Sequence, residues 1–170
     1  DCRQGMNSIN PDCKGTVILQ NSFIDDGVKS VSSKENILVI NIFSTKMINV
    51  AGFLMSVFEI FSRNNVSVDL ISTSEANISV TVDASQNVDN VIRELSSFAD
   101  VYVDRDKAQV SVIGKNLDNV TGILEKTFAP LSDYRIYMIS QGASYVNISF
   151  VVDRTALDKV VSLLHRSLFG

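Results

Sequence analysis

Residues 77–83 read NISVTVD and residues 147–153 read NISFVVD, so one short phrase recurs after an interval of 70 residues (147 − 77). Both copies begin with Asn-Ile-Ser and end with Val-Asp. Several matches in the same order indicate an internal repeat, and we therefore predict two copies of one unit behind an N-terminal extension. The other matches are Gly52 with Gly122 and Phe58 with Phe128, both at an interval of 70, and Ile71-Ser72 with Ile139-Ser140, at an interval of 68.

The first copy alternates between strand-like and helix-like patterns. Apolar β-branched runs predict strands, and apolar residues at helical spacing predict helices. In chain order, the predicted elements are strand 37–43, helix 53–61 ended by Asn64-Asn65, strands 66–71 and 78–82, helix 87–98 and strand 101–103. The order β-α-β-β-α-β is typical of the ferredoxin-like fold, which belongs to the α+β class.

The second copy repeats this order but ends before its last strand. Its predicted elements are strand 108–113, helix 121–129, strands 136–140 and 146–152, and a helix over 157–168. Without its last strand the sheet would keep an unpaired edge. We expect the strand-like run 28–32 to fill this position, which would nest the first unit inside the second. The predicted organisation is an extension at 1–26, a first unit at 27–104 and a second unit at 105–170.

Composition and charge exclude several classes of protein. The 170 residues suffice for one domain or two small ones. With 45% hydrophobic and 20% charged residues, the chain is typical of soluble globular proteins. A net charge of −4 argues against a nucleic-acid partner. No apolar run approaches the roughly 18 residues that span a membrane, and the polar first residues do not resemble a signal peptide, so we expect a cytoplasmic protein without a membrane partner.

Residues that could hold a metal or act as nucleophiles are scarce. Cys2, Cys13 and His165 are the only cysteines and histidine, fewer than the roughly four ligands of a structural zinc site. We expect Cys2 and Cys13 to be free thiols in a reducing compartment, with a disulfide between them as the alternative. No phosphate-binding glycine loop or nucleophile motif is present. The sequence therefore predicts no catalytic centre, no metal and no cofactor in this chain.

Three longer stretches resemble the C-terminal regulatory part of aspartate kinases, which carries two ACT domains in tandem. These stretches are Asn41–Gly52 (NIFSTKMINVAG), Val68–Glu75 (VDLISTSE) and Met138–Asp153 (MISQGASYVNISFVVD). Asn7–Pro11 and Gly15–Ile18 resemble the end of the kinase domain of that family. The likeness covers nearly the whole chain but not the kinase domain, where ATP and Mg²⁺ would bind. The chain therefore resembles a regulatory piece or a separately made subunit.

This resemblance implies feedback regulation of aspartate phosphorylation by an end-product amino acid, through a homodimer of ACT domains that acts on the kinase domain. Residues 71–75, with residues 140–144 in the second copy, are similar to the lysine-sensitive and plant-like enzymes. The threonine-inhibited kinases fused to homoserine dehydrogenase carry a different first-copy phrase. We therefore expect lysine as the effector, with threonine as the alternative.

The resemblance also implies the residues that contact the effector. Amides at a helix N-terminus bind carboxylates, and Gly52 would let the backbone approach the ligand closely. Asp69 would accept a hydrogen bond from the lysine ε-ammonium. Val50 stands where the lysine-sensitive pattern has a serine, which removes one expected hydrogen bond. The implied effector site comprises Met47, Val50, Gly52, Phe53, Leu54, Ser67, Val68, Asp69, Thr73, Ser74 and Glu75, and its counterpart in the second copy comprises Asn116, Gln141, Gly142 and Ala143.

Other interpretations stay open at the level of sequence. Gly52 could serve only to start a helix, Met47 to fill the core, and Asp69 or Glu75 to carry a solvated charge. The chain could also be an amino-acid sensor attached to another enzyme, or a structural dimerisation module that has lost its ligand. The kinase-like residues 7–18 argue against the first alternative, and Val50 favours the second.

Overall fold

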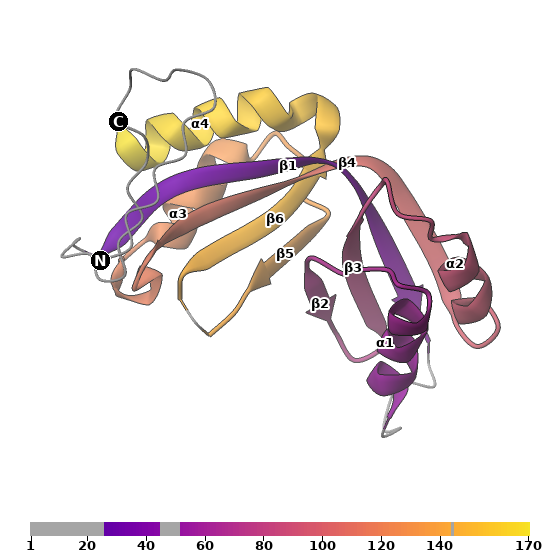
Figure 1. The fold of residues 1–170 in the computed structure, drawn as a ribbon. Coiled ribbons are helices and arrows are strands. Elements are labelled where there is room, and N and C mark those ends of the chain that lie inside the picture. The colour runs from indigo at the N-terminus through magenta and orange to yellow at the C-terminus, as the bar shows by residue number, and fades with distance from the viewer. Residues whose placement is uncertain (1–25, 45–51, 144) are drawn as a thin grey trace, which may run out of the picture.

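A computed structural model describes residues 26–44, 52–143 and 145–170 (Figure 1). The fold is α+β, with helices on one face of each half of an antiparallel sheet. The strands are β1 (Gly27–Phe43), β2 (Ile71–Thr73), β3 (Asn77–Asp83), β4 (Asp100–Lys115), β5 (Met138–Gln141) and β6 (Asn147–Asp153). The helices are α1 (Phe53–Arg63), α2 (Asp89–Leu95), α3 (Ile123–Phe128) and α4 (Leu157–Phe169), with short 3-10 turns at Leu117–Asn119, Ala129–Leu131 and Arg154–Ala156.

Two long strands run through both units. The sheet has the order β2-β3-β1-β4-β6-β5, so β1 and β4 lie side by side at its centre. Residues 37–43 of β1 pair with β3 and with the first half of β4, whereas residues 27–34 pair with residues 109–115 of β4. The first part of β1 therefore serves as the missing edge strand of the second unit. This confirms the predicted nesting, and Figure 1 shows β1 and β4 arching together from one unit to the other.

The two long strands share an irregularity where they pass between the units. The pairing of β1 with β4 shifts between Lys34 and Ile37. Asn36 and Asp106, which are separated by the repeat interval, both have a left-handed backbone with φ of 56° and 55°. Such a conformation is uncommon outside glycine but tolerated by Asn and Asp. The Ala84 amide donates to the Asn36 carbonyl at 2.8 Å, which ties the end of β3 to this bulge.

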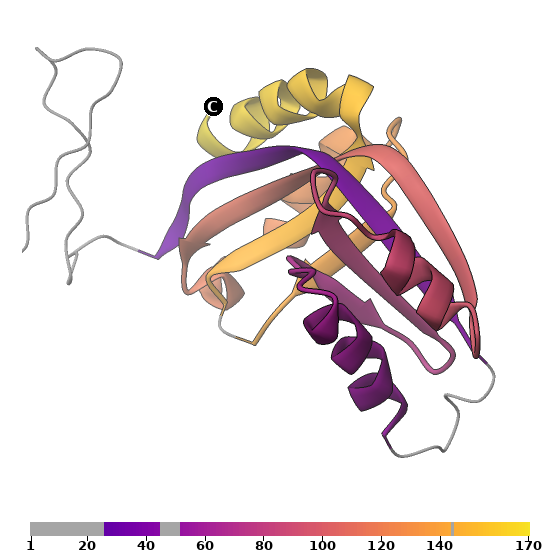
Figure 2. The ribbon, with the colours of Figure 1, turned by 45° about the vertical axis from the view of Figure 1, so that its right-hand side comes forward.

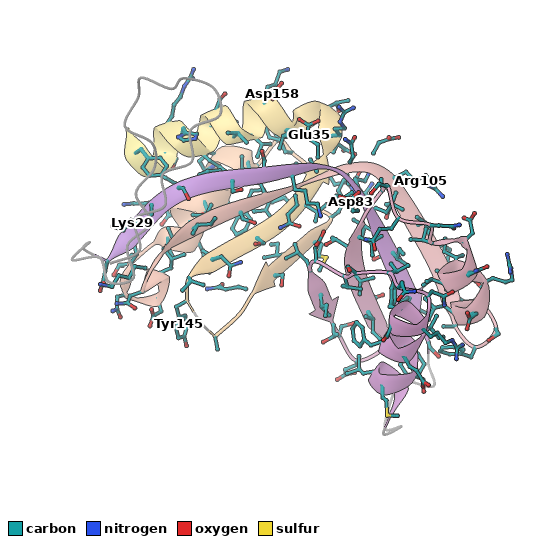
Figure 3. The ribbon with its side chains drawn as sticks, in the orientation of Figure 1. Lys29, Glu35, Asp83, Arg105, Tyr145 and Asp158 are labelled. Carbon is teal, nitrogen blue, oxygen red and sulfur yellow. The ribbon has the colours of Figure 1, made fainter. Side chains whose placement is uncertain are left out.

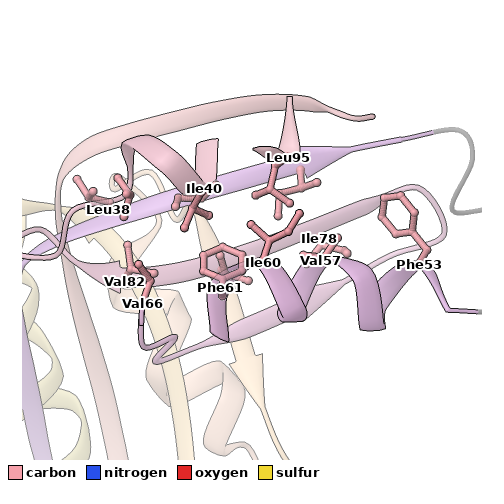
Figure 4. Packing of buried hydrophobic residues seen from close by; sticks show 14 residues of the cluster. Leu38, Ile40, Phe53, Val57, Ile60, Phe61, Val66, Ile78, Val82 and Leu95 are labelled. Carbon is pink, nitrogen blue, oxygen red and sulfur yellow. The ribbon is translucent and has the colours of Figure 1, made fainter. Parts of the chain in front are cut away.

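Each unit has its own hydrophobic core between its sheet and its two helices. In the first unit, Phe53, Val57 and Phe61 of α1 pack against apolar side chains of β1 and β3 (Figure 4). In the second unit, Phe150 packs edge-on against Phe128, with 5.3 Å between the ring centroids. A third, smaller cluster lies on the sheet face opposite the helices and joins the units; it comprises Ile37, Val39, Met138 and Val151, with Leu70 and Tyr137 at its edge.

Several element boundaries differ from those predicted. The predicted strands 101–103 and 108–113 are one continuous strand, β4, which passes through the predicted unit boundary at residues 104 and 105. The predicted strand over residues 66–71 is wrong for most of its length, because only Ile71–Thr73 is a strand. Asn65 has φ of 53°, and the Leu70 amide donates to the Thr81 hydroxyl rather than to a backbone carbonyl. Helices α2 and α3 are shorter than expected, and Pro130 lies in a 3-10 turn that follows α3.

The outer edges of the curved sheet approach each other. Figure 2 shows that the two units lie at an angle to each other, with β2 and β5 on the inner side of the bend. The Ser140 hydroxyl of β5 donates to the Ile71 carbonyl of β2 at 3.1 Å. No helix within residues 26–44, 52–143 and 145–170 is long and apolar enough to cross a membrane.

An ion pair between Lys107 and Asp153, joined by Tyr137, stabilises the second unit near the bulge. Lys107, whose side chain is 10% exposed, donates to Asp153 Oδ1 at 2.8 Å, and the Tyr137 hydroxyl donates to the same oxygen at 3.0 Å. The Lys107 ammonium also lies 4.2 Å from the centroid of the Tyr137 ring. The hydrogen bond from Lys107 lowers the pKa of Asp153 despite partial burial. Burial lowers the pKa of Lys107, but its bonds to Asp153 and Tyr137 outweigh this and raise it.

We expect the ion pair between Lys107 and Asp153 to make the stability of the fold decrease as the pH falls into the acid range. Because the folded-state pKa of Asp153 is depressed, its contribution is present above the unfolded-state pKa of about 3.9 and is lost as the pH falls through the lower folded-state value. Asp153→Asn should lower the free energy of unfolding at pH 7 by about 1 kcal/mol, a modest figure because Asp153 is 42% exposed. In this variant the free energy of unfolding should also decrease less steeply below pH 4 than in the unchanged chain. Urea unfolding from pH 7 to pH 3 measures both, with the exposed Asp133→Asn as control; an unchanged acid decline in Asp153→Asn would contradict the assignment.

Candidate functional site

The N-terminus of α1 presents backbone amides that could receive a ligand. Gly52 precedes the helix with φ of 90°, a conformation that favours glycine. Among the residues that the structure describes, no side chain caps this end, and no acidic residue lies in the first turn. The amides of Phe53 and Leu54 belong to the first turn, whose N–H groups have no partner within the helix. With the helix dipole, these amides favour an anion such as a carboxylate.

The turn between β2 and β3 lies at the same end of the first unit. β1 ends there at Phe43, which pairs with Asn77, the first residue of β3. The Ser74 amide donates to the Asn77 carbonyl at 2.8 Å and closes the turn. Thr73, Ser74 and Glu75 are exposed. The structure therefore places two groups of expected site residues, 52–54 and 73–75, at one end of this unit.

Ser67, Val68 and Asp69 lie at the other end of the unit. They follow the C-terminus of α1, and Asp69 donates its amide to the carbonyl of Thr81 at 2.9 Å. Ser67 is held by Gln86, whose side chain accepts from the Ser67 amide at 2.7 Å and donates to the Ser67 carbonyl at 3.0 Å. Val68 packs against the first core.

One chain therefore does not bring all the expected effector residues together. Asn77, beside the turn, and Thr81, beside Asp69, are four residues apart on β3, or about 14 Å at the rise of an antiparallel strand. Helix α1 separates Gly52 from the 67–69 segment by a similar length, since its 11 residues rise about 16 Å. A single amino acid is too short to span this distance within one chain.

Asp69 is paired with an internal cation. Lys34 Nζ donates to Asp69 Oδ2 at 2.5 Å and lies 3.4 Å from Asp83 Oδ2. The hydrogen bond with Asp69 raises the pKa of Lys34 despite partial burial. Asp83 is fixed by Ser85, whose hydroxyl and amide donate to Oδ1 at 2.6 and 2.9 Å. These bonds, followed by the charge of Lys34, lower the pKa of Asp83.

The expected residues of the second unit gather around one turn. Asn116 has a left-handed backbone, and the amide of Leu117, which follows it, donates to the Tyr145 carbonyl at 2.9 Å. The Tyr145 amide donates to the Gly142 carbonyl at 3.4 Å. Gln141, Gly142 and Ala143 are exposed at the end of β5.

Asn116 already has a partner in the segment that enters β1. Its side-chain amide donates to Asp26 Oδ1 at 2.8 Å, and Asn119 donates to Asp26 Oδ2 at 3.3 Å. The bond from Asn119, followed by that from Asn116, lowers the pKa of Asp26. Sequence reasoning missed Lys34, Gln86 and Asp26 because each meets its partner through the fold, Lys34 at a separation of 35 residues. No local pattern indicates such pairs.

A groove of about 810 Å³ runs between α1 and α2. Gly52 and Phe53 line one end of it, and the ion pair between Arg63 and Glu94 lies at the other. Asp69 and the 73–75 turn do not line it. The groove therefore overlaps the expected effector site only at the N-terminus of α1.

Some predictions fall outside the described residues. Met47 and Val50 of the expected site lie there, as do Cys2 and Cys13. Within the described part of the chain, no group of three or more His, Cys, Asp or Glu side chains is arranged to hold a metal ion.

Comparison with known proteins links this arrangement to one family. The profile of the ACT domain family matches residues 40–96 and 110–168. The chain is 38% identical to aspartokinase 1 of Arabidopsis thaliana, a chloroplastic protein, over 96% of this chain and 31% of that protein. It is 31% identical to the lysine-sensitive aspartokinase 3 of Escherichia coli, over 95% of this chain and 38% of that protein.

A solved structure has the same fold. The crystal structure of E. coli aspartokinase III in complex with lysine and aspartate superposes with a TM-score of 0.82 at 32% identity, over 95% of this chain and 37% of that one. This chain thus spans about a third of the length of the curated relatives it matches.

Proposed function

Because this chain belongs to the ACT domain family and matches the C-terminal regulatory region of aspartokinases, we propose that it is an allosteric sensor for an end-product amino acid. Lysine is the effector that we favour, and binding would inhibit the phosphorylation of aspartate by ATP. The observation that carries the proposal is the pair of complementary groups in the first unit. The amides at Gly52–Leu54, which no side chain of the described residues caps, suit the α-carboxylate, and the Asp69 carboxylate suits the ε-ammonium.

The separation of these groups supports a homodimer. Since residues 52–54 and 67–69 lie at opposite ends of the first unit, one ligand can contact both only if a second copy supplies one of them. A two-fold axis would place the α1 N-terminus of one chain beside Asp69 of the other and create two equivalent sites. The relative crystallised with lysine supports this ligand, since it has the same fold over nearly the whole of this chain.

The rest of the proposed mechanism depends on a kinase domain. ATP and Mg²⁺ would bind there, and we expect no catalysis by this chain alone. A differential affinity of the effector for two arrangements of the dimer, worth about 1–3 kcal/mol, would shift the kinase by roughly an order of magnitude. A cytoplasmic location stays a prediction, since the Arabidopsis relative is chloroplastic.

Thermal unfolding with lysine, threonine, methionine and buffer tests the proposal. At about 100 times the dissociation constant, a ligand adds roughly 2.7 kcal/mol, which should raise the midpoint by about 5–10 °C in a chain of this size. Sedimentation in the same solutions reports whether lysine favours the dimer. A rise with threonine alone would assign the site to threonine, and no rise with any amino acid would favour a structural dimerisation module.

A further inference from the structure

The carboxylate that we assign to the effector is occupied by the chain's own ammonium group. Lys34 Nζ donates to Asp69 Oδ2 at 2.5 Å, and the two side chains are 40% and 33% exposed. The pair is therefore open to solvent and to ligands. The ε-ammonium of free lysine has the same charge, the same three donors and the same flexible stem as the side chain of Lys34.

We propose that Lys34 is a built-in competitor of the effector's ε-ammonium at Asp69 and so sets the affinity and the amino-acid specificity of this site, an inference that rests on the proposed function. An incoming ammonium must replace Lys34 on Oδ2 or bind Oδ1 beside it. In either position the positive charge of Lys34 opposes the positive charge of the ligand. An amino acid with an uncharged side chain meets no such opposition.

A second carboxylate allows Lys34 to move aside at small cost. Asp83 Oδ2 lies 3.4 Å from Lys34 Nζ, and the bonds from Ser85 hold Asp83 in place through its other oxygen. When a ligand takes Asp69, Lys34 keeps an anionic partner by shortening its contact with Asp83. The exchange therefore leaves no cation without a partner.

The position of Lys34 links this exchange to the junction of the two units. Lys34 pairs with Gln109 in the part of β1 that completes the second unit, next to the irregular step before Ile37. Asp69 belongs to the segment between α1 and β2 of the first unit. The ion pair thus joins the expected ligand segment to the shared strand, and its exchange changes a contact at the bulge. In Figure 3, Asp83 and Glu35 mark this region in the middle of β1, whereas Lys29 lies toward the N-terminal end of the strand.

Calorimetric titration of the full chain and of Lys34→Gln tests the proposal with two probes, lysine and norleucine. Norleucine has the backbone and the aliphatic chain of lysine but lacks the ε-ammonium. Removal of an exposed competing charge should tighten lysine binding about two- to fivefold, in line with the strength of exposed ion pairs. Norleucine affinity should stay unchanged. Lys29→Gln, which removes the same charge from the same strand, should leave both affinities unchanged.

The outcomes separate this inference from the proposed function. Lysine binding that is equal or weaker in Lys34→Gln would overturn competition while leaving lysine sensing intact. Equal tightening of lysine and norleucine would show that Lys34 does not act on the ε-ammonium and would also overturn it. In the double variant Lys34→Gln/Asp69→Asn, the Lys34 substitution should no longer tighten lysine binding, since the Asp69 carboxylate for which the two ammonium groups compete is gone. No binding of lysine to either the chain or Lys34→Gln would contradict the proposed function itself.

Discussion

Asp69→Asn should weaken lysine binding about 10- to 100-fold, because it replaces the anionic acceptor of the ε-ammonium by a neutral one. Hydrogen bonds to charged groups contribute about 1.5–3 kcal/mol, which corresponds to this range. The free chain should lose little stability, since Asp69 and Lys34 form an exposed pair. Titration with lysine measures the loss, and thermal unfolding without ligand verifies that the variant folds.

Asp83→Asn is the matched control for this variant. It removes the other carboxylate near Lys34 at the same end of β3, but it leaves Asp69 in place. We expect lysine affinity to change by less than about threefold, within the range of an exposed ion pair. If Asp69→Asn bound lysine as tightly as the unchanged chain, Asp69 would not contact the ε-ammonium, and the assignment of the site would have to move to the groove between α1 and α2.

Phe150→Ala and Phe61→Ala should each lower the free energy of unfolding by about 3–5 kcal/mol, as large-to-small substitutions of buried aromatic side chains do. Phe150 is fully buried in the second unit, and Phe61 is 2% exposed in the first. In a chain of this size the midpoint should fall by about 10 °C or more. Both variants should still unfold in one transition, because β1 and β4 run through both units and neither sheet half can lose them alone.

Calorimetry and near-ultraviolet circular dichroism measure this cooperativity. The control is Tyr102→Ala, because Tyr102 is an aromatic residue of β4 with 65% exposure and no place in either core. Two separated transitions in Phe150→Ala, one of them at the midpoint of the unchanged chain, would show that the first unit folds independently. In that case the shared strands would not transmit stability between the units.

The fold could be predicted where the pattern is local. The repeated phrases at residues 77–83 and 147–153 are the strands β3 and β6, which flank the central pair β1 and β4. Their apolar side chains face a core, and Ser79 and Ser149 face the other side. The continuity of β4 could not be predicted, because its charged residues 104–107 resemble a loop. In the structure they lie in a strand because Asp104 pairs with Val39 and Lys107 with Ile37 of β1, and Lys107 also pairs with Asp153 of β6.

The expected effector site could be predicted only in part. Residues 52–54 and 73–75 lie at one end of the first unit, as a contiguous site requires, but residues 67–69 do not. Their apolar alternation predicted a strand. Only the Asp69 amide bonds to a backbone carbonyl of β3, that of Thr81, whereas the Ser67 amide bonds to the Gln86 side chain and the next amide, of Leu70, to the Thr81 hydroxyl. The pairing of Asp69 with Lys34 depends on the nesting of the units, which places residues distant in sequence beside each other.

The edge strand of the second unit, residues 27–34, precedes the first unit in the sequence, and this order limits how the chain can be cut into separate domains. A proteolytic or recombinant piece covering residues 105–170 would expose β4 along the side that β1 residues 27–34 cover in the intact chain. An exposed strand edge of this kind recruits other strands and promotes aggregation. The second unit would become a separate soluble module only through circular permutation, with residues 27–34 joined behind α4. No single cut in the polypeptide yields two complete halves.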